Sequence, residues 1–133
     1  MKKTPRQAAV DILNTVFQNR SFASDLLDEY LERQALSGTA DGRLLTHLVY
    51  GVLRMRGHLD WILTRFYRGD FARMEEVVKN ILRTGLYQLR FSDRLPAYAV
   101  VDESVKIAKQ KNRAAGGLVN GVLRSYLRSA EKI

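Results

Sequence analysis

Apolar residues recur three and four positions apart along most of the chain, the spacing that places side chains on one face of an α-helix. The β-branched alternation that marks strands is absent, and the only prolines stand at positions 5 and 96. We therefore predict an all-α fold. The pattern indicates helices over approximately residues 4–17, 21–34, 44–57, 58–67, 71–91 and 96–111, and a last helix after residue 113.

The segment from Ile81 to Phe91 is apolar around more than one face. Together with Val77 and Val78, its aliphatic residues span about half of the helix circumference, and Tyr87 and Phe91 fall in the other half. A helix of this kind cannot lie on a surface. We predict that it is the central helix of the fold, packed by neighbours on more than one side.

Three of the predicted helices carry a glycine in the middle, namely Gly51, Gly85 and Gly121. A mid-helix glycine costs about 1 kcal/mol relative to alanine, so a close contact should repay it. We interpret the three glycines as helix crossing points, where another backbone approaches.

The overall composition fits one soluble unit. A chain of 133 residues with 46% hydrophobic composition can bury one good core, so we expect a single domain over residues 1–133. The absence of cysteine excludes disulfides and cysteine chemistry and fits a cytoplasmic protein. No apolar run approaches the roughly 18 residues of a membrane span, so we expect no membrane partner.

Positive charge is concentrated in particular segments of the chain. The net charge is +8, and no Asp or Glu occurs between Lys106 and Arg128, whereas acidic residues gather between Asp25 and Glu32. This distribution favours a polyanionic partner over the alternative of a generally basic, solubilising surface. The predicted RNA-binding residues are Lys2, Lys3, Arg6, Lys106, Lys109, Lys111 and Arg113.

Catalytic and metal-binding patterns are lacking. His47 and His58 have no second ligand at metal spacing, and the neighbours Glu75 and Glu76 would point about 100° apart on a helix. The glycines of segment 116–121 follow no strand and lack the order of a nucleotide-binding loop. We therefore expect no catalytic residue, no metal and no cofactor.

A second basic region contains aromatic residues. Arginines 54, 56, 65, 68 and 73 surround Trp61, Phe66, Tyr67 and Phe71, a combination suited to stacking on unpaired bases. The alternative is that these aromatics belong to the core, as aromatics at helical spacing usually do.

Several ordered motifs make the sequence resemble the NusB superfamily. They are the segments 49–54 (VYGVLR), 59–62 (LDWI), 85–89 (GLYQL), 99–105 (AVVDESV) and 117–124 (GLVNGVLR). The likeness covers nearly the whole chain and is strongest from Leu44 to Arg128. It is closer still to the NusB-like N-terminal domain of bacterial small-subunit rRNA 5-methylcytosine methyltransferases, the Sun/Fmu/RsmB group.

This resemblance implies about seven helices in two small bundles around a central helix, and a role in RNA binding. In NusB an arginine-rich N-terminus contacts antiterminator RNA beside a ribosomal protein, and Lys2, Lys3 and Arg6 would take that place here. The methyltransferases need a further domain with an S-adenosylmethionine site and cysteine nucleophiles, and this chain has no cysteine.

The leading hypothesis is thus a noncatalytic RNA-binding domain, with ribosomal RNA as its ligand, either excised from an rRNA methyltransferase or standing alone. The alternative is a protein-interaction module of the NusB type, which binds a ribosomal or transcription-antitermination protein. We expect a monomer or a weak homodimer.

Overall fold

The computed structural model describes residues 3–130, and in this part of the chain every regular element is helical. The elements are α1 (Pro5–Asn19), α2 (Ala23–Arg33), α3 (Ala40–Phe66), a 3₁₀ turn η1 (Phe71–Arg73), α4 (Glu76–Phe91), α5 (Ala97–Lys111) and α6 (Arg113–Ala130). The all-α prediction is confirmed. The expected count of about seven is slightly high, because residues 3–130 form six α-helices and one short turn.

The missing helix results from α3, which is continuous where two helices were predicted. Its 27 residues pass through Gly57 without a break. Gly57 faces solvent, and Leu59, Ile62 and Leu63 continue the buried face that Leu48 and Val52 begin. Burial of this apolar face outweighs the roughly 1 kcal/mol that an internal glycine costs.

The central helix is shorter than predicted. It begins at Glu76, not Phe71, because Phe71 to Arg73 form a separate turn in which the Asp70 side chain accepts a hydrogen bond from Ala72 N. Phe71 is buried and anchors this turn to the core. The last two helices meet at Asn112, whose extended backbone ends α5 and whose Oδ1 accepts from Ala115 N at the start of α6.

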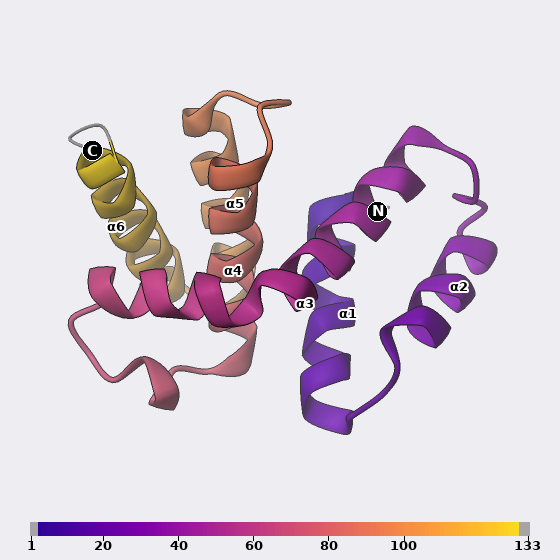
Figure 1. Cartoon of the computed structure of the whole chain (residues 1–133), viewed down its shortest axis with the longest axis horizontal. Coiled ribbons are helices and arrows are strands. Elements are labelled where there is room, and N and C mark those ends of the chain that lie inside the picture. Colours follow the sequence, from indigo (N-terminus) through magenta and orange to yellow (C-terminus); the bar gives the residue numbers. More distant parts are fainter. Residues whose placement is uncertain (1–2, 131–133) are drawn as a thin grey trace.

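The helices form two groups that α3 connects (Figure 1). The first half of α3 packs with α1 and α2, and its second half crosses the group of α4, α5 and α6. Helix α4 contacts α1, α3, α5 and α6, and its residues 80–88 are all buried. The prediction of two small bundles around a central helix is therefore confirmed.

At two of the three glycines another residue approaches closely, but it does so through its side chain and not its backbone. A Cβ at Gly51 would lie 2.2 Å from Tyr87 Cζ, and one at Gly85 would lie 2.8 Å from Ser104 Oγ and 3.0 Å from Leu123 Cδ1. The interpretation of Gly121 as a crossing point is wrong. Gly121 is exposed, and a Cβ there would meet nothing within 4 Å.

Arg83 joins α3 to α4 inside the core. It is 1% exposed, and its Nε and Nη2 donate to the two carboxylate oxygens of Asp60 on α3 at 2.7 and 2.8 Å. Its Nη1 donates to Glu76 at 2.9 Å and to Asn80 at 2.8 Å. Burial alone would lower the pKa of Arg83, but the hydrogen bonds and charges of Asp60 and Glu76 raise it above its ordinary value.

Arg83 thereby determines which way the neighbouring residues of α3 point. Asp60 is turned inward by its two hydrogen bonds to the guanidinium. Because successive helical residues point about 100° apart, Trp61 is turned out of the core and remains 60% exposed.

Candidate nucleic-acid interface

The predicted N-terminal basic residues are engaged with other side chains. Lys2 lies outside the described residues. Lys3 Nζ lies 2.5 Å from Asp11 Oδ2, and Arg6 Nε donates to Gln88 Oε1 on α4 at 2.6 Å. Burial lowers the pKa of Arg6 from its ordinary value, and the charges of Glu103 and Asp41 offset part of that effect.

The predicted basic residues of α5 and α6 differ among themselves. Lys111 Nζ lies 2.7 Å from Glu75, and Lys106 Nζ lies 3.9 Å from Glu103. Lys109 and Arg113 are exposed and have no carboxylate within 4.0 Å in residues 3–130. The aliphatic stem of Lys109 packs against Gly116.

The structure does not unite these residues into one positive patch. Arg6 bonds Gln88 near the end of α4, whereas Lys111 pairs with Glu75 just before its start. These anchor points are about 20 Å apart along the helix at 1.5 Å per residue. Glu103 lies between the two sets, and Asp102 shares a surface groove with Lys106 and Lys109.

A different row of basic and aromatic side chains follows the outer face of α3. Its members, spaced three and four residues apart, are Arg43, His47, Tyr50, Arg54, His58, Trp61 and Arg65, and all of them are exposed. At 100° per residue the seven positions fall within an arc of about 80°. We call them the α3 outer face, and none of its members is acidic.

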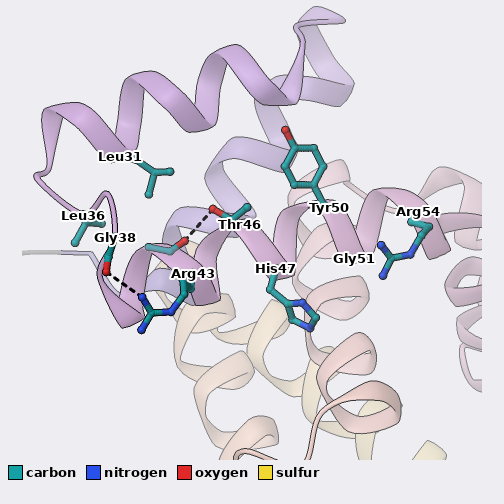
Figure 2. Close-up of a pocket in the computed structure, with 10 residues that line it drawn as sticks. Leu31, Leu36, Gly38, Arg43, Thr46, His47, Tyr50, Gly51 and Arg54 are labelled. Atoms are coloured by element: carbon teal, nitrogen blue, oxygen red, sulfur yellow. Dashed lines mark hydrogen bonds between the residues drawn. The ribbon is translucent and has the colours of Figure 1, made fainter.

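One groove lies along the first half of this face, with a volume of about 440 Å³. Figure 2 shows Arg43, His47 and Arg54 on α3, Leu31 on the neighbouring α2, and Leu36 and Gly38 at the end of the groove beside Arg43. Arg43 Nη1 donates to Gly38 O at 2.9 Å, which fixes the guanidinium at the groove's edge. No Asp or Glu lines this groove.

Gly51 lines the groove and leaves room for the buried Tyr87 behind it. The Tyr87 ring fills the space that a side chain at Gly51 would need, and its hydroxyl lies 3.2 Å from His47 Nε2. The His47 and Tyr87 rings also meet edge to face, with centroids 5.5 Å apart. These contacts hold the His47 imidazole in place on the outer face.

A second groove, of about 460 Å³, lies beside the second half of the face. It is lined by His58, Trp61, Ile62, Arg65, Phe66, Arg90, Tyr126 and Ser129, again without an acidic residue. The Arg65 guanidinium carbon lies 5.0 Å from the Trp61 ring centroid, and Arg90 Nη1 donates to the Tyr126 hydroxyl at 3.0 Å.

The four aromatic residues of the second basic region differ in exposure, and their stacking on bases stays a prediction. Trp61 is 60% exposed on the outer face, whereas Phe71 is buried and Phe66 and Tyr67 are half-buried. Arg43, His47 and Tyr50 were not predicted from the sequence as members of the same surface. Their spacing of three and four residues could have revealed the row. The sequence, however, predicted that a helix ends near Gly57, which placed Trp61 and Arg65 on a separate helix.

Neither a cluster of metal ligands nor a bilayer-spanning helix is found in residues 3–130. No three His, Asp or Glu side chains gather there as metal ligands would. None of the helices described has the length and hydropathy needed to cross a bilayer.

Comparison with known proteins gives consistent matches. The model of the NusB family matches residues 3–128. The probable ribosomal RNA small subunit methyltransferase B of Synechocystis sp. is 34% identical over 128 residues, and that of Bacillus subtilis is 36% identical over 130. Each alignment covers 96% of this chain but only 28% and 29%, respectively, of the relative, so the chain spans less than a third of their length.

Solved structures share the fold at lower identity. One chain in the crystal structure of antitermination factors NusB and NusE in complex with dsRNA aligns with this chain with a TM-score of 0.84 at 23% identity. The alignment covers 94% of both chains. A chain from the crystal structure of a plectonemic RNA supercoil aligns with a TM-score of 0.86, also at 23% identity, over 95% of this chain and 93% of that one.

Proposed function

Because the chain belongs to the NusB family, we propose that it is a noncatalytic RNA-binding domain acting as one unit over residues 1–133. The observation that carries the proposal is the α3 outer face. It places Arg43, Arg54 and Arg65 beside two grooves that no carboxylate lines. Such a surface attracts phosphate without internal competition, and the net charge of +8 adds long-range attraction.

The basic residues predicted from the sequence take a supporting part in this proposal. Lys109 and Arg113 are exposed and can contact phosphate directly. Lys3, Lys106 and Lys111 would first exchange a carboxylate for a phosphate. That exchange is cheap at a surface, where an ion pair contributes about 0–1 kcal/mol. Arg6 keeps its hydrogen bond to Gln88 and contributes mainly its charge.

The names of the relatives support ribosomal RNA of the small subunit as the ligand. Both are methyltransferases of that RNA, and this chain corresponds to less than a third of each. We propose that the chain contributes RNA positioning and that the methyl transfer of the relatives belongs to parts of them that it does not match.

A salt titration tests RNA binding. Fluorescence anisotropy of a labelled small-subunit rRNA hairpin with a single-stranded tail is followed at several salt concentrations. We expect the logarithm of the association constant to fall linearly with the logarithm of the salt concentration, because each neutralised phosphate releases counterions. Unlabelled small-subunit rRNA should compete better than tRNA. A flat salt dependence, or no binding at low salt, would refute the proposal.

A protein-binding role is the second candidate, and two exposed aromatic residues favour it. Phe91 is 44% exposed and Tyr98 is 68% exposed, and they flank the turn between α4 and α5. Exposed aromatics of this kind are typical anchors in protein interfaces. Calorimetry with a purified NusE-type protein should detect a complex that Tyr98→Ala weakens, and no heat of binding would count against this role.

A further inference from the structure

We propose that the α3 outer face is a track for single-stranded RNA, on which an unpaired base stacks on Trp61 while the arginines of the row hold the backbone. The inference rests on the proposed RNA-binding function and makes it more specific, since it assigns the nucleic-acid class and the site. It is based on the continuity of α3, the exposure of its aromatic rings and the absence of carboxylates from both adjoining grooves.

The face has the dimensions of a strand-binding surface. From Arg43 to Arg65 it extends about 33 Å along a single helix, at 1.5 Å per residue. Positive side chains occur near both ends and in the middle, at Arg43, Arg54 and Arg65. Folds that bind single strands without strict sequence preference combine a basic groove with aromatic platforms in the same way.

Trp61 is the best platform on the face. Its ring is 60% exposed although His58 stacks near it, at 6.4 Å between centroids and 19° between planes, and Arg65 approaches it to 5.0 Å. These two neighbours restrict the rotamers of the indole. Rotamer freedom that these contacts already limit need not be lost again when a base stacks on the ring.

The rings select an unpaired strand over a duplex. Tyr50 and Trp61 are about 16 Å apart along the helix, so they would contact two bases that are not neighbours in the strand. Bases can reach both rings only if they are unstacked and turned toward the protein. In duplex RNA the faces of the bases are covered by their neighbours, so only the arginines could engage it.

Intrinsic fluorescence gives a direct test because Trp61 is the only tryptophan in the chain. The 133-residue protein is titrated with 12-nucleotide single-stranded RNA, with a 12-base-pair RNA duplex and with inorganic polyphosphate. We expect single-stranded RNA to quench the emission of Trp61. Polyphosphate, which carries charge but no bases, should not quench it, and the duplex should bind with little quenching.

Variants separate stacking from charge. Trp61→Ala should weaken single-strand binding roughly 5- to 150-fold, the loss of one base–aromatic stack, and leave duplex affinity nearly unchanged. Trp61→Phe should restore most of the affinity. Tyr98→Ala removes an equally exposed aromatic from α5 and should have no effect on RNA binding. Circular dichroism should confirm that each variant remains helical.

The possible outcomes distinguish this inference from the function on which it rests. Salt-dependent RNA binding without quenching, and with full affinity in Trp61→Ala, would overturn the track while RNA binding stands. Failure of every RNA to bind would overturn both. A blue shift of the emission that grows with protein concentration and needs no RNA would show that a second copy covers Trp61, which also overturns the track.

Discussion

The α3 outer face and the basic residues of α1 and α5 carry charge of the same sign but differ in what surrounds it. On α5, Lys106 and Lys111 lie within 4 Å of Glu103 and Glu75, and on α1 Lys3 lies beside Asp11. On α3, Arg54 and Arg65 have no carboxylate within that distance in residues 3–130. Pairing with nearby carboxylates, within α5 for Lys106 and from another element for Lys111, decides which surface offers open charge, and the count of basic residues in a segment does not.

The two regions also differ in how they are built. The basic residues of α1 and α5 come from separate helices that both pack against α4. The α3 outer face comes from one rigid helix, whose inner side is fixed by Asp60 and Arg83. A strand that follows α3 therefore meets side chains whose spacing is fixed by helix geometry alone.

The largest effect is expected from removing Arg83, because the orientation of α3 depends on it. Arg83→Met should lower the free energy of unfolding by about 3–5 kcal/mol, since Asp60 and Glu76 would remain partly buried without their partner. Urea denaturation measures the change. The matched control Arg54→Met makes the same substitution on the exposed face and should alter stability by less than about 0.5 kcal/mol. Equal stabilities would contradict a role for Arg83 in holding α3.

Two glycines of α3 test how this helix packs, because Gly51 lies on its buried side and Gly57 on its exposed side. Gly51→Ala should destabilise the fold by about 1–3 kcal/mol, because its Cβ would fall 2.2 Å from a Tyr87 ring that is 2% exposed and has little room to move. Gly57→Ala meets nothing within 4 Å and should stabilise the helix by up to about 1 kcal/mol. Thermal unfolding of both variants gives the comparison, and opposite signs are expected.

The charge comparison can be made with two double variants in the salt titration. Arg54→Gln with Arg65→Gln should reduce the salt slope for single-stranded RNA by about 1.4, two phosphates at about 0.7 each. Lys106→Gln with Lys111→Gln removes the same charge but should reduce the slope less, because those lysines already have carboxylate partners. A larger loss in the second variant would place the main contact on α5.

The fold was largely predictable from the sequence because its strongest signals are local. An apolar pattern on more than one face of segment 81–91 identified the central helix, and residues 80–88 of α4 are indeed all buried. The continuity of α3 was not predictable from Gly57 alone. A glycine lowers local helix propensity, and only the packing of Leu59 and Ile62 on other helices overrides it.

The site was harder to predict because it depends on contacts between distant residues. Arg83 looks like one more cation in a basic chain, and its burial depends on Asp60, which lies 23 positions earlier. Lys111 looks available in a segment without acidic residues, yet Glu75 approaches it from another element. Trp61 joins the row of Arg43, His47 and Tyr50 only when residues 40–66 form one helix.

The smallest effect on RNA affinity is expected from removing the carboxylate partner of a paired lysine. Glu75→Gln frees Lys111, whose ammonium then competes for phosphate without a carboxylate 2.7 Å away. RNA affinity should rise by less than about fivefold, since a surface ion pair contributes about 0–1 kcal/mol. Glu29→Gln is the matched control, because it also removes one negative charge and breaks an exposed pair, with Arg33 on α2. An equal rise in both variants would mean that only net charge matters, whereas a rise confined to Glu75→Gln would show that carboxylate pairing is what keeps the α5 lysines from RNA.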